Sequence, residues 1–211
     1  MLSKLMRLSG ILLVLAGLLV AISWIFHPLT PDERAMQSTR WLIVHGLGGV
    51  GVLLSVPGLV GLYIRLSDES GVLGLVGFIL AVIGTALVAG AILFLEVATL
   101  PVIAALSNAE ELFNDAPPVF IAIFAITFIT FAVGFILLGL VTLRSTLLPR
   151  WAGLLLLIGA PLFFFPVPPA PVIVNTIGAV LLGLGYVWLG YSLLTGTSSI
   201  IEAETRFSPA A

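Results

Sequence analysis

The sequence predicts an all-α integral membrane protein built as a bundle of six transmembrane helices. Hydrophobic residues make up 60% of the chain and charged residues only 9%, whereas soluble domains carry about 25% charged residues. The apolar residues also lie in long runs. The run from Gly71 to Leu100 continues for about two dozen residues without a charge before it reaches Glu96. A helix of that length crosses the hydrocarbon layer of a bilayer, which is about 30 Å thick.

Six apolar runs predict the helices, and each is close to the spanning length except the fifth. They cover residues 8–26, 41–64, 72–98, 119–143, 151–165 and 172–194. Pro161 interrupts the fifth run, and four more prolines follow it at Pro166, Pro168, Pro169 and Pro171. Neighbouring helices must then satisfy the carbonyls that these prolines free. We expect one transmembrane domain over residues 1–197 and a short cytoplasmic tail over 198–211.

The first run has a second interpretation, as the core of a signal peptide. Lys4 and Arg7 precede it, and Ala21 and Ser23 suit a cleavage site. The run is long for such a core, which favours a membrane helix.

Lysine and arginine near the helix ends mark the cytoplasmic side of a membrane protein. Lys4, Arg7, Arg65, Arg144, Arg150 and Arg206 fall on one predicted side, and only Arg34 and Arg40 fall on the other. We therefore expect a multi-pass protein of the plasma membrane, which is the cell inner membrane in a bacterium. Both termini should lie in the cytoplasm.

The helices suggest three related in-out-in hairpins. Arg7-Leu-Ser-Gly10 opens the first helix much as Arg150-Trp-Ala-Gly153 opens the fifth. Parallel repeats of this kind occur in membrane folds. The alternative is compositional similarity, because helices rich in leucine and glycine match one another easily.

Small residues recur at helical spacing and predict close contacts between helices. The second helix carries Gly48, Gly51, Ser55 and Gly58, and the third carries Gly77, Ala81, Thr85 and Ala89. Such Gly/Ala faces predict a tightly packed bundle. They also predict that the chain, besides contacting the lipid bilayer, associates with other membrane proteins or with itself.

Polar side chains gather at one predicted level, in the outer third of the membrane. His45 and Glu96 each lie about one turn from the outer end of their helices, on faces that point into the bundle. Asn175 is at a similar depth. The candidate polar pocket comprises His27, Arg40, His45, Glu96, Thr99 and Asn175.

Two interpretations of this group remain open. An ionised carboxylate at the bilayer centre costs about 2.5–3.5 kcal/mol on insertion scales, so a buried Glu96 needs a partner or a proton. His45 and Glu96 could then bind a cation or exchange a proton. Alternatively, these residues border the headgroup region, where polar side chains cost little.

The remaining motifs exclude most site chemistry and predict neither a catalytic residue nor a cofactor. The chain has no cysteine, which excludes disulfides and thiolate metal sites. Its net charge of -2 without a basic cluster excludes a nucleic-acid surface. His27 and His45 could ligate a haem only across a short reach beside Pro28, and three metal ligands are lacking. The glycines of residues 45–51 precede no strand–helix unit, so they are not a dinucleotide motif.

We therefore expect a non-catalytic multi-pass protein, an accessory or assembly subunit or a sensor in a larger membrane complex. The alternative is a small transporter or channel that handles an ion or small solute through the pocket around His45 and Glu96. A continuous hydrophilic path is hard to draw, because the middle and inner parts of the helices carry few polar groups.

Overall fold

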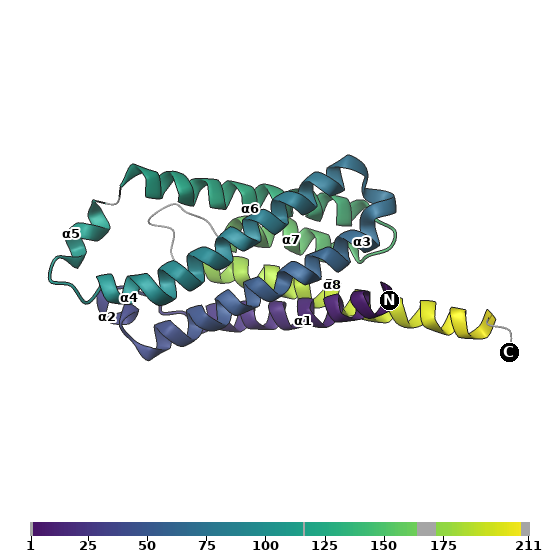
Figure 1. Cartoon of the computed structure of the whole chain (residues 1–211), viewed down its shortest axis with the longest axis horizontal. Helices are drawn as coiled ribbons and strands as arrows, with labels where there is room; N and C mark the ends of the chain where they lie inside the picture. The colour runs from purple at the N-terminus through teal and green to yellow at the C-terminus, as the bar shows by residue number, and fades with distance from the viewer. Residues whose placement is uncertain (1, 116, 164–171, 208–211) are drawn as a thin grey trace.

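The structure, a computed structural model, describes residues 2–115, 117–163 and 172–207, with side chains described as far as residue 196 except that of Asn114. These residues form helices and no strands (Figure 1). Four helical stretches are long and apolar enough to cross a membrane, namely Leu2–Ile25, Thr39–Ile103, Pro118–Arg144 and Val172–Gly196. The all-α, membrane-embedded class predicted from the sequence therefore agrees with the structure.

The long stretch from Thr39 combines α3 (Thr39–Gly90), the π-helix η1 (Ala91–Thr99) and α4 (Leu100–Ile103). Around it lie the other long helices, α1 (Leu2–Ile25), α6 (Pro118–Arg144) and α8 (Val172–Phe207), and the shorter apolar α7 (Arg150–Phe163). Two short helices, α2 (Glu33–Met36) and α5 (Ala109–Asn114), complete the described chain.

The non-helical connection between the predicted second and third helices is shorter than expected. Residues 65–71 were expected to connect them, but α3 stays helical through Ser70 and only Gly71 leaves helical geometry, with φ 53° and ψ -153°. Exposed polar residues such as Asp68 and Glu69 can stay helical at the end of the bundle. The positive φ requires glycine. α3 therefore consists of two helices, Thr39–Ser70 and a second that starts after Gly71, and the chain reverses between them (Figure 1).

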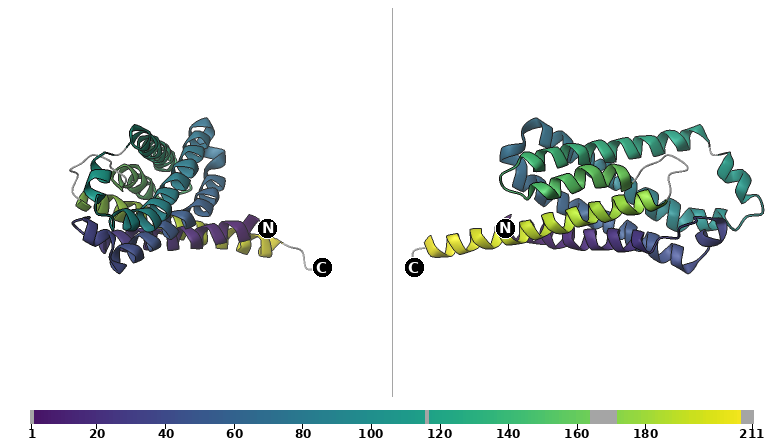
Figure 2. Two further views of the ribbon diagram at one scale, coloured as in Figure 1. Left: turned by 60° about the vertical axis from the view of Figure 1, so that its left-hand side comes forward. Right: turned by 180° about the vertical axis from the view of Figure 1, so that it is seen from behind.

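Each long helix packs against its neighbours in the chain, and the last packs against the first. The contacting pairs are α1 with α3, α3 with α6, α6 with α7, α7 with α8, and α8 with α1. Gly51 and Gly58 face α1, whereas Gly77 and Gly84 face α6, so the two helices of α3 have different neighbours. The helices thus form a closed ring, seen from two further sides in Figure 2.

Glycines allow the backbones to approach closely around this ring. A Cβ added at Gly17 would meet the carbonyl oxygen of Gly183, and one added at Gly139 would meet that of Gly153. Lipid supplies no hydrophobic force between helices, so this close packing holds them together. The small-residue faces predicted from the sequence are therefore occupied within the chain, around a core that contains Tyr186.

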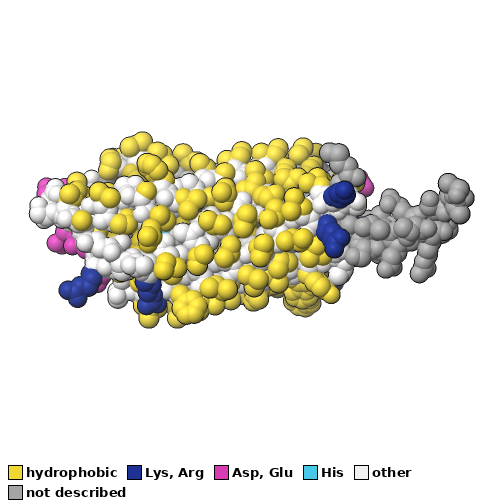
Figure 3. Space-filling model, turned by 60° about the horizontal axis from the view of Figure 1, so that its bottom comes forward, with side chains coloured by type: hydrophobic (Ala, Val, Ile, Leu, Met, Phe, Trp, Pro, Cys, Tyr) yellow, Lys and Arg dark blue, Asp and Glu magenta, His cyan; other side chains and the backbone are white. Residues whose placement is uncertain are grey.

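The bundle has two distinct ends, separated by an apolar surface. The short helices α2, α4 and α5 lie at one end, called here the short-helix end (Figure 1). The turn at Gly71, the start of α1 and the α6–α7 connection lie at the other, the kink end. Charged side chains gather at the ends on the face shown in Figure 3, and hydrophobic side chains cover the surface between them.

The fifth and sixth predicted helices correspond to α7 and α8. The aromatic and proline residues 164–171, which end the fifth predicted run and follow it, lie outside the described residues. The helix of α8 continues past the predicted end at residue 194 and reaches Phe207. The backbone of the predicted tail is therefore helical over residues 198–207.

Candidate functional site

Three elements bring His27, His45 and Glu96 together at the short-helix end. His27 follows α1 on its connection to α2, His45 lies in the second turn of α3, and Glu96 lies in η1. Hydrogen bonds fix the connection that carries His27. The Asp32 side chain caps α2 by accepting from the backbone N–H of Ala35 at 2.7 Å.

The first turn of α3 is also held in place. Ser38 is its N-cap, and its hydroxyl oxygen accepts a hydrogen bond from the backbone N–H of Trp41 at 3.1 Å. Capping of this kind satisfies donors that the helix itself leaves free. Arg40 donates from Nε to the carbonyl of Phe26 at 2.9 Å, which ties α3 to the residue just before His27.

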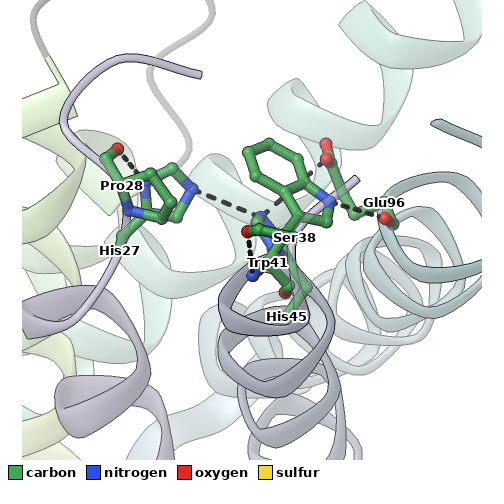
Figure 4. Close-up of polar contacts among 6 residues, drawn as sticks. All are labelled: His27, Pro28, Ser38, Trp41, His45 and Glu96. Carbon is green, nitrogen blue, oxygen red and sulfur yellow. Dashed lines mark hydrogen bonds and ion pairs between the residues drawn. The ribbon is translucent and has the colours of Figure 1, made fainter. Parts of the chain in front are cut away.

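The two imidazole rings face each other through their Nε2 atoms, which are 3.3 Å apart (Figure 4). On its other side, Nε2 of His45 lies 3.8 Å from a carboxylate oxygen of Glu96. Each Nδ1 atom contacts a backbone carbonyl, that of Pro28 at 2.7 Å for His27 and that of Trp41 at 2.9 Å for His45. We call His27, His45 and Glu96 the His–Glu cluster.

Burial differs across the cluster. His27 is 8% exposed and His45 is 6% exposed, whereas the side chain of Glu96 is 26% exposed. Glu96 is therefore the member of the cluster in contact with the surroundings of the bundle, and the two histidines lie behind it.

Two tryptophans enclose the histidines. The ring of His27 stacks on Trp24 with centroids 4.6 Å apart and planes 6° from parallel. The ring of His45 lies against Trp41, with centroids 4.0 Å apart. The faces of indole rings carry negative charge density and attract cations. The two histidines of the cluster are thus packed against aromatic side chains.

The backbone around Glu96 forms a π-helix, and Pro101 leaves one of its carbonyls without a hydrogen-bond donor. In η1 each N–H bonds five residues back, as Leu100 does to the carbonyl of Leu95. Pro101 has no N–H, so the carbonyl of Glu96 lacks its donor. Trp41 supplies one: its indole Nε1 donates to this carbonyl at 2.7 Å. The same indole therefore positions both His45 and the backbone of Glu96.

His27 lies outside the apolar helices, and burial lowers its pKa below the ordinary value of 6.5. The hydrogen bond with the Pro28 carbonyl opposes this effect, and the guanidinium of Arg40 lowers the pKa further. Neutral His27 is therefore favoured over its charged form at neutral pH.

The other three residues of the predicted pocket make separate contacts. Arg40 bonds the carbonyl of Phe26 and is exposed. The Thr99 hydroxyl donates to the carbonyl of Phe94 at 2.8 Å within η1, and the Asn175 amide donates to that of Phe163 at 3.0 Å. The structure thus brings His27, His45 and Glu96 together directly, while Thr99 and Asn175 donate hydrogen bonds to nearby backbone carbonyls.

Trp24 and Trp41 carry no sequence signal that assigns them to this site, because tryptophan is also common at membrane interfaces. One signal was present. Pro101 lies five residues after Glu96, and a proline in an apolar helix frees a carbonyl that must find another donor.

The part of the chain that the structure describes contains no group of three or more histidine, aspartate or glutamate side chains placed to hold a metal ion. An open depression of about 430 Å³ at the short-helix end is lined by Pro31, Asp32, Glu33, Arg34, Met36 and Phe113. None of these residues belongs to the His–Glu cluster.

Comparison of the chain with protein-family models, curated proteins and solved structures found no match.

Proposed function

We propose that this chain is a non-catalytic membrane protein that works as an accessory or sensor subunit of a larger membrane complex. The observation that carries this proposal is the filled interior of the described helices. Gly134 packs against the backbone of Ala81, and Gly178 packs against that of Phe163. Tyr186 is buried against Phe135 in the same interior. Backbones this close leave little room for a solute to pass.

The polar groups that could line a path support the same proposal. The Thr127 hydroxyl donates to the carbonyl of Ile123 on its own helix, at 2.9 Å. That of Thr85 is buried with no hydrogen-bond partner. A conducting path needs polar groups in succession, and neither of these two hydroxyls bonds another polar side chain.

The topology belongs to the same proposal. If each helix of α3 crosses the membrane once, then α1, α3, α6, α7 and α8 together cross it six times. The kink end would be cytoplasmic because it carries Lys4, Arg7, Arg65, Arg144 and Arg150, while the short-helix end carries Arg34 and Arg40. The short-helix end would then face outward from the plasma membrane.

Copurification from native membranes tests the subunit role. The intact chain, carrying a small affinity tag, is extracted in mild detergent, and bound proteins are identified and counted by mass spectrometry. A partner in fixed stoichiometry is expected. A chain that purifies alone and carries a bound solute would contradict the proposal. Reporter fusions at both termini test the topology separately, and opposite locations would reject six crossings.

A transporter or channel for an ion or small solute is the second candidate. The convergence of His27, His45 and Glu96 from three elements favours it, because such chains of titratable groups carry protons in transporters. Purified protein in liposomes should then dissipate a pH or solute gradient, and Glu96→Gln should abolish this activity. Wild-type protein that leaves every tested gradient intact would reject this candidate.

A further inference from the structure

The hydrogen bonds at Nδ1 fix the protonation pattern of both histidines. The carbonyls of Pro28 and Trp41 can only accept hydrogen bonds, so the Nδ1 atom of each histidine carries the proton. In a neutral imidazole the other nitrogen, Nε2, is then an acceptor without a proton. Both histidines therefore point an Nε2 lone pair at the other ring.

Two lone pairs at this separation cannot form a hydrogen bond without a further proton. The Nε2 atoms are 3.3 Å apart, which is a hydrogen-bonding distance only if one of them is protonated. Both rings are more than nine-tenths buried, so water has little access to either nitrogen. One added proton turns a repulsive contact into an N–H···N hydrogen bond.

The surroundings stabilise the positive charge that this proton brings. The Glu96 carboxylate on η1 lies 3.8 Å from Nε2 of His45, the one ion pair of His45 among the described residues. The indole faces of Trp24 and Trp41 pack on the two imidazole rings, and contact with an indole face stabilises a buried cation. Arg40 lies on the His27 side and disfavours a charge there. The charge is therefore best placed on His45, with His27 as the neutral acceptor.

In the described part of the chain, the other charged groups at this end are Asp32, Glu33 and Arg34, on α2 and its cap, and the acids Glu110, Glu111 and Asp115, on α5 and its C-cap. The nearby part of α8 bears no titratable side chain and contacts Trp24 through the hydroxyl of Thr176, at 3.4 Å from its carbonyl. α1 after Arg7, α4, and α7 after Arg150 also carry no charged residue.

We propose that the His–Glu cluster is a binding site for a single proton, held between Nε2 of His45 and Nε2 of His27, with the Glu96 carboxylate as its counter-charge. The proton comes from water and returns to it through Glu96, the most exposed member of the cluster. Its loss leaves two facing lone pairs beside a carboxylate, so the connection that carries His27 should separate from α3. The geometry of this site is independent of any partner, and only its placement on the outer side rests on the proposed topology.

The native chain allows a direct test, because His27 and His45 are its only histidines. The intact protein is made with ¹⁵N-labelled histidine, purified with a histidine-free tag and treated with chelator. It is then titrated by NMR in detergent micelles. We expect both Nδ1 atoms to stay protonated throughout. Below one pH midpoint we expect a scalar coupling between the two Nε2 nitrogens, and above it this coupling should disappear.

Glu96→Gln tests the counter-charge, and Glu110→Gln, an exposed acid at the same end, is the matched control. Removing an opposite charge at this distance should lower the pH midpoint by about one unit or more, whereas the control should leave it unchanged. Two independent histidine titrations, an unprotonated Nδ1, or a coupling that is absent at every pH would each overturn the proposal. Paired histidine signals that are present before the chelator treatment and lost after it would also overturn the proposal, because a bound metal would then account for the pairing.

Discussion

Trp41 donates its indole hydrogen to the backbone carbonyl of Glu96, which is the carbonyl that Pro101 leaves without a donor in the π-helix. The atoms are 2.7 Å apart. This contact joins the first helix of α3 to η1 and places the Glu96 carboxylate beside His45. A carbonyl that lacks a donor in its own helix thus accepts a hydrogen bond from a side chain of another helix.

Trp41→Phe should destabilise the protein, because it leaves this carbonyl without a donor and removes part of the ring that packs on His45. A buried carbonyl without a partner costs about 1–3 kcal/mol. Thermal unfolding in detergent, followed by circular dichroism, measures the loss. Trp188→Phe is the control, because Trp188 is 42% exposed and should tolerate the change. Equal losses for the two variants would contradict this role of Trp41.

Pro101→Ala should reduce the cost of Trp41→Phe. Alanine at position 101 restores a backbone N–H that can reach the Glu96 carbonyl, so the indole is no longer its sole donor. The unfolding free energies of the wild type, both single variants and the double variant give the coupling between the two positions. Strictly additive effects would show that Pro101 and Trp41 act independently.

Alanine should destabilise the protein at Gly134 but not at Gly90. A Cβ at position 134 would collide with the backbone of Ala81, whereas one at position 90 has nothing within 4 Å. Gly134→Ala should cost about 1–3 kcal/mol through overpacking. Gly90→Ala should be neutral or gain about 0.5–1 kcal/mol, since glycine within a helix is unfavourable relative to alanine. Similar losses at both positions would contradict the ring packing.

Gly71→Ala tests the backbone reversal within α3. The position has open space for a Cβ, so the whole cost arises from forcing alanine to φ 53°. Strain of this type costs about 1–3 kcal/mol. Gly46→Ala is the matched control, because its Cβ also meets nothing within 4 Å and its backbone is helical. Thermal unfolding should separate the two variants, and a loss at Gly46 as large as that at Gly71 would count against the strain.

Glu69 should stabilise the kink end in a pH-dependent way. Its carboxylate accepts hydrogen bonds from the Ser145 hydroxyl at 2.6 Å and from the Thr146 N–H at 3.1 Å. The Ser145 and Thr146 hydrogen bonds hold its pKa below the ordinary value of 4.5. The stabilisation is therefore complete above the unfolded-state pKa and is lost as pH falls through the lower, folded-state value.

Unfolding temperatures of the wild type and Glu69→Gln measure this effect. The difference should be present at pH 7 and should shrink as the pH falls below about 4.5, the ordinary glutamate value. Asp68→Asn, at the neighbouring exposed position, is the control for the loss of an acidic side chain at this end of the bundle. A constant difference between wild type and Glu69→Gln across this range would contradict the prediction.

The sequence by itself determined the helical, membrane-embedded class, because long apolar runs leave helices as the structure that satisfies the backbone in lipid. It also placed His45 and Glu96 at one level, since depth follows from the position of a residue along its helix. It also predicted a break between residues 64 and 72. It could not show that the helix continues to Ser70 and that only Gly71 leaves it, because the residues before Gly71 can be helical or not, depending on what surrounds them.

Only the tertiary structure decided which of the predicted polar residues meet. Position along a helix gives the height of a side chain but not the direction in which a neighbouring helix presents its own. The closed ring of helices turned His27 toward His45 and placed Trp41 over the carbonyl freed by Pro101. Thr99 and Asn175 instead bond carbonyls near them, Thr99 that of Phe94 within η1 and Asn175 that of Phe163.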